Sequence, residues 1–259
     1  MSTNRIALVT GGAGGLGYSI CTKLHEKGYR VVLTHSPSNT TIKETLADMK
    51  ARGHDFHAYP VDVADYDSCQ RCVAAIQKDV GQIDILINNA GITRDMTFRK
   101  MTKPDWDSVM RTNLDSMFNM TKPIVDGMVD RGWGRIVNVS SIHGLYASPF
   151  KSAYVTAKHG LEGLSKVIAL EGAPHGVTSN CVNPAYVRTP LVEKQIADQA
   201  RQHGIGEDEV VEKIMLTPVA VKRLVEPDEV AELAAVLYGP ASASLTGASL
   251  TLDGGWTAH

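Results

Sequence analysis

Residues 5–17 read Arg-Ile-Ala-Leu-Val-Thr-Gly-Gly-Ala-Gly-Gly-Leu-Gly, an apolar, β-branched run that passes directly into a cluster of glycines. The run predicts a buried strand, and the amphipathic stretch after it predicts a helix that begins near Gly14. Glycine permits the sharp turn between them and leaves no Cβ between the backbone and a phosphate. The amino end of the helix offers unpaired N–H groups to an anion. The stretch therefore predicts a strand, loop and helix that bind the pyrophosphate of a dinucleotide.

The same alternation of short apolar runs and longer amphipathic stretches continues along the chain. Strands are expected at Arg5–Val9, Arg30–Thr34, Phe56–Val61, Ile83–Asn88, Arg135–Ser140, Ser179–Val182 and Ser249–Leu252. Helices are expected at Gly14–Lys27, Ile42–Arg52 and Tyr66–Val80, with further helices between and after the later strands. This alternation predicts an α/β fold of the Rossmann type, a doubly wound parallel sheet with helices on both faces. Residues 1–259 are expected to form a single domain.

One segment departs from the alternation. Leu191–Leu216 carries two helical patterns around Gly204-Ile205-Gly206. Glycines at that place allow a hinge, and mobile helical segments often close over a substrate. We therefore expect a small helical substrate lid at about residues 190–218.

The composition is that of an ordinary globular protein, with 43% hydrophobic and 21% charged residues and a formal net charge of −2. This balance provides no broad basic field for nucleic acid and no polybasic patch for a membrane surface. The polar first residues and the lack of an apolar run of about 18 residues predict a cytoplasmic protein. Cys69 and Cys72 form a C-x-x-C pair inside a helical pattern with no second ligand pair, so no metal site is expected and all four cysteines are expected to be reduced thiols.

Tyr154 and Lys158 stand at positions i and i+4, on one face of an expected helix. A neighbouring ammonium favours the phenolate and lowers the pKa of a tyrosine, so Tyr154 is a candidate acid and base for a hydroxyl or carbonyl oxygen. Ser141 follows the strand expected at Arg135–Ser140, and sheets of this kind bind ligands at the carboxyl ends of their strands. A hydrogen bond from Ser141 to the substrate oxygen completes the predicted site.

Taken in order, these motifs resemble the short-chain dehydrogenase/reductase family over essentially the whole chain. Asn88-Asn89-Ala90-Gly91 and the segment at 184–189 match two further family motifs, with Ala185 in place of the usual glycine. The resemblance implies hydride transfer between NAD or NADP and a small hydroxyl or carbonyl substrate. It implies a catalytic tetrad of Asn113, Ser141, Tyr154 and Lys158, with Asn113 in a water-linked proton relay, and a homotetrameric assembly. It further implies that the cofactor is bound by Gly11, Gly14, Gly15, Leu16, Gly17, Ser36, Asp62, Val63, Asn89, Ala90, Gly91, Tyr154, Lys158, Pro184, Val187 and Thr189.

Two subfamily resemblances compete for the substrate. The middle of the chain, including the segment from Ile87 to Asp95, is similar to bacterial acetoacetyl-CoA reductases. The carboxy half, including the segment from Pro149 to Tyr154, is similar to D-3-hydroxybutyrate dehydrogenases. Segments after the later strands set specificity in most proteins of this family, which favours reversible oxidation of (R)-3-hydroxybutyrate to acetoacetate. The alternatives are an acetoacetyl-CoA (3-oxoacyl thioester) reductase, a reductase for another small ketone, and, from another class, a non-catalytic dinucleotide-sensing protein.

The dehydrogenase resemblance assigns the substrate to Thr93, Ser141, His143, Lys151, Tyr154, Tyr186 and Gln195. Lys151, His143 and Gln195 would bind the carboxylate, because a free carboxylate favours charge-assisted donors, whereas a thioester would leave Lys151 unpaired. Thr93 stands where these dehydrogenases carry glutamine, which removes one expected donor. Each assignment has a structural alternative: Lys151 solvated at the surface, His143 bonded to backbone, and Gln195 facing solvent.

The end of the second expected strand leaves NAD and NADP both open. Residues 33–41 contain no acid to bind the ribose hydroxyls and no arginine to bind a 2′-phosphate. Hydroxyls such as that of Ser36 serve either cofactor.

Overall fold

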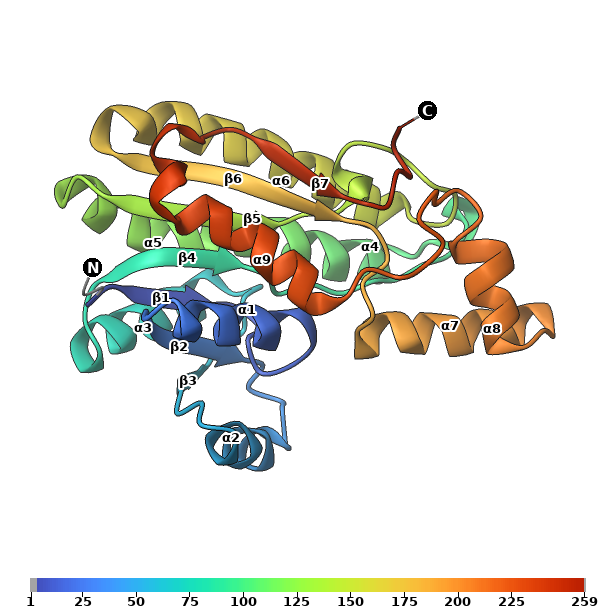
Figure 1. The fold of residues 1–259 in the computed structure, drawn as a ribbon, viewed down its shortest axis with the longest axis horizontal. Helices are drawn as coiled ribbons and strands as arrows, with labels where there is room; N and C mark the ends of the chain where they lie inside the picture. Colours follow the sequence, from blue (N-terminus) through green and yellow to red (C-terminus); the bar gives the residue numbers. More distant parts are fainter. Residues whose placement is uncertain (1–3, 259) are drawn as a thin grey trace.

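The short apolar runs form a parallel sheet in the computed structural model, which describes residues 4–258 (Figure 1). The strands are β1 (Ile6–Val9), β2 (Arg30–His35), β3 (His57–Pro60), β4 (Ile83–Asn88), β5 (Gly134–Val139), β6 (Val177–Pro184) and β7 (Ser249–Leu252). Their spatial order is β3-β2-β1-β4-β5-β6-β7, and all neighbouring pairs are parallel. The order reverses between β1 and β4, so the loops after these two strands diverge and leave a crevice for a ligand.

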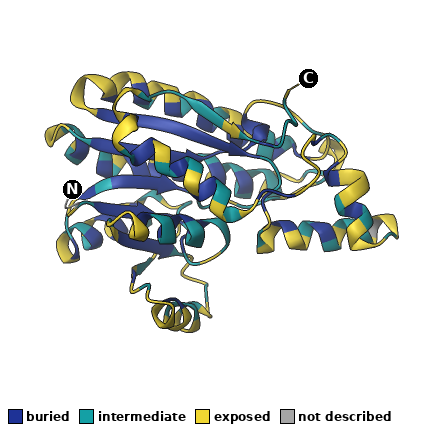
Figure 2. Cartoon of the chain, viewed as in Figure 1, coloured by how far each residue is buried: buried dark blue, intermediate teal, exposed yellow. Residues whose placement is uncertain are grey.

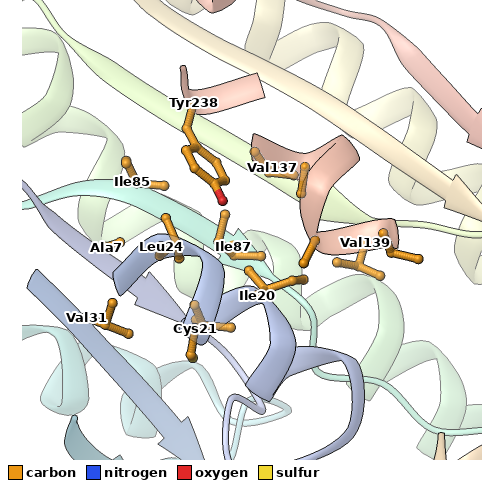
Figure 3. Packing of buried hydrophobic residues seen from close by; sticks show 14 of the residues in the cluster. Ala7, Ile20, Cys21, Leu24, Val31, Ile85, Ile87, Val137, Val139 and Tyr238 are labelled. Atoms are coloured by element: carbon orange, nitrogen blue, oxygen red, sulfur yellow. The ribbon is translucent and has the colours of Figure 1, made fainter. Parts of the chain in front are cut away.

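Helices cover both faces of the sheet, and the predicted fold class is confirmed. The α-helices of the described residues are α1 (Gly15–Glu26), α2 (Ile42–Ala51), α3 (Tyr66–Asp79), α4 (Lys103–Met110), α5 (Ser116–Asp130), α6 (Ser152–Gly172), α7 (Pro190–His203), α8 (Glu207–Val210) and α9 (Pro227–Tyr238). Ile20 and Leu24 of α1 and Tyr238 of α9 pack against Ile85 and Ile87 of β4 on one face (Figure 3). On the opposite face, α3 and α5 contribute residues to a second apolar cluster. The outward sides of these helices are exposed and the central strands are buried (Figure 2).

Strand β6 extends beyond the predicted Ser179–Val182 at both ends. All its residues are buried, the polar ones included. Asn138 of β5 donates to the hydroxyl oxygens of Ser165 and Ser179 at 3.1 and 3.2 Å, and Asn180 donates to the Leu245 carbonyl at 2.8 Å. Buried polar groups are stable when they are hydrogen-bonded in this way. The polar composition therefore leads the sequence to underestimate the length of a fully buried strand.

The cysteines of the C-x-x-C pair point into the core. Cys69 and Cys72 lie on the buried face of α3, and burial raises the pKa of Cys69 to about 12 and that of Cys72 to about 11. A protonated, buried thiol is a poor nucleophile and metal ligand. Within residues 4–258, the helices are too short or too polar to cross a bilayer.

Helices α7 and α8 lie together at one end of the molecule, beyond the carboxyl ends of the strands (Figure 1). Helix α7 ends at His203 and is capped by Gly204, whose φ of 65° places it in the left-handed region that glycine adopts without strain. The pair encloses its own apolar cluster, which includes Val192, Ile196 and Val210. Two helices therefore occupy the segment for which the sequence predicts a lid.

Candidate active site

A cavity of about 680 Å³ opens at the carboxyl ends of the strands, within the size range of small-molecule sites. The sixteen residues that the sequence assigns to the cofactor all line it. Further walls come from residues that the sequence did not assign to the cofactor, namely Thr34, His35, Val61, Ile92, Thr112, Val139, Ser140, Ala185, Pro190, Leu191 and Val192. Only their position next to the motifs could have indicated them.

The glycine loop after β1 is packed too closely for larger residues. A Cβ at Gly17 would lie 2.4 Å from the Gly11 carbonyl oxygen and 2.7 Å from the Asn89 amide, whereas one at Gly14 would meet nothing within 4 Å. Gly14 also begins α1 without a side-chain cap, so the first N–H groups of that helix remain available to an anion. This cradle fits a dinucleotide pyrophosphate.

The loops after β1 and β4 are tied to each other. Thr10 Oγ1 accepts hydrogen bonds from the backbone N–H groups of Asn89 and Ala90 at 2.9 and 3.0 Å, and Asn89 Nδ2 donates to the Thr10 carbonyl at 2.9 Å. Because Asn89 and Ala90 also line the cavity, these bonds fix one wall of it. At the end of β2 the wall consists of Thr34, His35 and Ser36, none of them acidic, so the geometry leaves both NAD and NADP open.

Tyr154 and Lys158 project from one face of α6, with Lys158 Nζ 5.6 Å from the centre of the Tyr154 ring. Lys158 donates to the Val139 carbonyl at 2.7 Å, and burial lowers its pKa to about 8. Burial raises the pKa of Tyr154 to about 12, although a hydrogen bond with Ser141 acts in the opposite direction. In the protein without cofactor, desolvation of the phenolate outweighs the hydrogen bond from Ser141, so the pKa of Tyr154 lies above its ordinary value and not below it as the sequence predicts.

Ser141 stands two residues after the end of β5 and caps the short turn Ile142–Gly144. Its hydroxyl oxygen accepts the backbone N–H of His143 at 3.2 Å and lies 3.3 Å from Nδ1 of the same residue. Burial, with a smaller contribution from the charge of Lys151, lowers the pKa of His143 to about 4. The ring is therefore neutral near pH 7, and its buried Nε2 has no hydrogen-bond partner. A neutral imidazole with one free nitrogen suits recognition of a polar substrate group.

Asn113 lies behind the cavity wall rather than in it. It occupies a π-helical turn, Arg111–Asp115, and both ends of its side-chain amide bond the backbone of Ile92 at 2.8 Å. The side chain thereby fixes the loop after β4.

A smaller pocket of about 70 Å³ adjoins the cavity beside Ser141 and Tyr154. The seven residues that the sequence assigns to the substrate all line it, together with Ile142, Ala185, Leu191 and Val192. Gln195 Nε2 donates to the hydroxyl of Thr93 at 3.3 Å, so Gln195 is held toward the pocket. Lys151 is 9% exposed and is not a solvated surface lysine. The ring of His143 faces the Ser141 side chain rather than a backbone group.

The Ala185 departure from the family motif causes no strain. Among the described non-glycine residues, only Phe150 has a positive φ. Alanine is therefore compatible with the backbone at position 185.

Sequence reasoning missed three groups around this pocket. Asp95 forms an ion pair with Lys151. The ring of Trp256 packs on that of His143, with their centres 6.0 Å apart. Glu162, buried in α6, accepts from Asn183 Nδ2 at 2.6 Å, and the same nitrogen donates to the Ser141 carbonyl at 3.0 Å. The sequence assigned none of these residues a role, because the role of each depends on a contact between distant segments.

Comparison with known proteins agrees with this geometry. Residues 5–200 match the family model described as short chain dehydrogenase. The chain is 46% identical over 253 residues to an acetoacetyl-CoA reductase of Cupriavidus necator, with 98% of each chain covered. It is 40% identical over 258 residues to a D-beta-hydroxybutyrate dehydrogenase of Rhizobium meliloti, covering 98% of this chain and 99% of the relative. A crystal structure of an actinorhodin polyketide ketoreductase with NADPH has a TM-score of 0.93 and 31% identity, covering 100% of this chain and 99% of the other.

Proposed function

The chain belongs to the short-chain dehydrogenase family and is an NAD(P)-dependent oxidoreductase, and we propose that it catalyses the reversible oxidation of (R)-3-hydroxybutyrate to acetoacetate. The observation that carries this proposal is the small pocket that the buried Lys151 lines together with Ser141 and Tyr154. A cation buried at this place suits a substrate with a free carboxylate near its reacting hydroxyl.

The size of the pocket also supports a small free acid. One buried water needs about 10–15 Å³, so a pocket of about 70 Å³ accommodates roughly five to seven such groups. That is comparable with a four-carbon hydroxy acid. The carboxylate would accept from Lys151 and from His143 Nε2, with Gln195 and Thr93 at its side and Tyr186 as the aromatic wall.

The proposed chemistry removes a hydride and a proton from the alcohol. The glycine loop and the walls of the larger cavity would hold NAD(P), which would supply the hydride acceptor. Ser141 would hold the substrate oxygen by a hydrogen bond, and Tyr154 would take the hydroxyl proton. Lys158 would supply the cation that stabilises the phenolate and would bind the nicotinamide ribose. By family resemblance, the relay through which Lys158 exchanges protons with solvent includes Asn113.

A second candidate, reduction of acetoacetyl-CoA, is favoured by a different observation. Asp95 neutralises Lys151, so this pocket is not a bare cationic site. The acetoacetyl-CoA reductase of Cupriavidus necator has the higher identity of the two named relatives. A thioester needs no ammonium partner, and its long arm would leave through the open end of the larger cavity.

The two candidates are distinguished by absorbance at 340 nm. The purified protein would be assayed with (R)-3-hydroxybutyrate and NAD or NADP, and with acetoacetyl-CoA and each reduced cofactor. Rapid reduction of an oxidised cofactor by the free acid supports the proposal and identifies the preferred cofactor. Turnover of the thioester alone overturns it. The Lys151→Met variant keeps the length of the side chain without its charge, and we expect about a tenfold or greater rise in KM for the free acid.

We further propose that α7 and α8 form a mobile lid and that the protein assembles as a homotetramer. Leu191, Val192 and Gln195 of α7 line the pocket, so movement of α7 would open or close it.

Phe118 on α5 and Leu170 on α6 are 51% and 78% exposed, which suits burial against other copies of the chain. Light scattering after size-exclusion chromatography tests the assembly, and a monomer would refute it.

A further inference from the structure

The acidic partner of Lys151 sits outside the substrate pocket. Lys151 lines the pocket, whereas Asp95 pairs with its ammonium from the loop after β4. The side chains of Lys151 and Asp95 are 11% and 28% exposed, so the pair is largely shielded from water. In such surroundings an ion pair is screened less than a surface pair.

The main chain holds Asp95 in this position. The next residue, Met96, donates its N–H to the Phe150 carbonyl at 2.8 Å and forms a parallel β-bridge with Lys151. Phe150 takes a φ of 71°, a conformation that non-glycine residues adopt rarely. Asp95 and Lys151 are therefore fixed to each other through their backbones as well as through their charges.

Resting on the function proposed above, we infer that Asp95 is a specificity-determining residue, an internal carboxylate that competes with the substrate carboxylate for Lys151. A buried ammonium without a partner is costly, and Asp95 removes that cost while the pocket contains no acid. An incoming free acid must displace Asp95 or share the ammonium with a second negative charge. A thioester carbonyl meets neither obstacle.

Asp95 therefore weakens the binding of free acids selectively, because a small carboxylate must compete with it for Lys151. The negative charge of Asp95 also acts on Tyr154, where it contributes to the raised pKa of the phenol. Without the negative charge of Asp95, the ammonium of Lys151 would pair with the substrate carboxylate.

The test compares Asp95→Asn with the wild-type enzyme and with Asp55→Asn, a control that removes an exposed aspartate paired with Lys50. We expect Asp95→Asn to lower KM for (R)-3-hydroxybutyrate about tenfold and to leave KM for acetoacetyl-CoA within about twofold. The control should change neither. An unchanged or higher KM for the free acid in Asp95→Asn would overturn the inference.

Binding of butyrate separates this inference from the proposed function. Butyrate carries the carboxylate without the reacting hydroxyl, and its affinity for the enzyme saturated with cofactor is measurable by calorimetry. We expect Asp95→Asn to bind butyrate about tenfold more tightly, and expect no such gain when Lys151→Met is present as well. If the wild type does not oxidise the free acid but this gain is found, the proposed substrate is wrong and the role of Asp95 stands. If the gain is absent or persists without Lys151, the role of Asp95 is refuted.

Discussion

Substitution of His143 by glutamine should remove a measurable part of the pH dependence of stability. The buried ring has a pKa of about 4 in the folded protein, against an ordinary value of 6.5. Between these two values the unfolded chain binds a proton that the folded chain excludes. Stability therefore falls as the pH is lowered through this window, and the neutral amide of glutamine lacks the effect.

The magnitude follows from the two pKa values. Between pH 7 and pH 5, exclusion of the proton costs about 2 kcal/mol of folding free energy at this residue. For a protein of 259 residues, about 1 kcal/mol corresponds to a change of roughly 2–4 °C in Tm. The wild type should therefore lose about 4–8 °C more than His143→Gln over this interval.

The assay is thermal unfolding of the protein without substrate at pH 7, 6 and 5, followed by tryptophan fluorescence. His175→Gln, at an exposed turn, is the matched control and should keep the wild-type pH dependence. Equal slopes for the wild type and His143→Gln would show that the ring is charged or solvated in the folded protein. The neutral, pocket-facing imidazole would then be refuted.

Three other changes test the site and the core. Tyr154→Phe should lower kcat about 10²-fold or more while the affinity for reduced cofactor, measured by fluorescence titration, stays within about threefold. Gly17→Ala should lower both cofactor affinity and Tm because its Cβ would lie 2.4 Å from a backbone oxygen, whereas Gly163→Ala, in open space on α6, should not lower Tm. Asn138→Ala should cost about 2–4 kcal/mol in denaturant unfolding, because its buried amide nitrogen donates to three neighbouring groups and its oxygen accepts from Asn88; a loss below about 0.5 kcal/mol would contradict that account.

The parts of the fold that the sequence predicts well are those specified by local physics. Ile83–Asn88 and Ser249–Leu252 have the predicted bounds, since both are short β-branched or apolar runs bounded by turn residues. The sequence predicts the glycine loop equally well, because the close approach of neighbouring backbone leaves no room for a side chain at Gly17. Motif residues also came together as expected, since the carboxyl ends of parallel strands share one edge of the sheet.

Predictions that depend on contacts between distant segments were less complete. The polar residues of β6 suggested a shorter strand, because their partners in β5 and α6 cannot be read locally. The pKa of Tyr154 was expected to fall, yet the outcome depends on how deeply the phenol is buried. Glu162 and its link through Asn183 to the Ser141 backbone carried no sequence signal at all.

The choice of substrate also depends on a contact between distant segments. Asp95 comes from the segment that resembles acetoacetyl-CoA reductases, and Lys151 comes from the segment that resembles D-3-hydroxybutyrate dehydrogenases. The fold brings the two together as an ion pair at the edge of the pocket. Neither segment alone therefore indicates how strongly the pocket attracts a carboxylate, because the ammonium from one is neutralised by the acid from the other. Under the inference above, Asp95 and the substrate carboxylate compete for Lys151. Removal of the Asp95 charge would then raise the affinity for a free acid, and removal of the Lys151 charge would lower it.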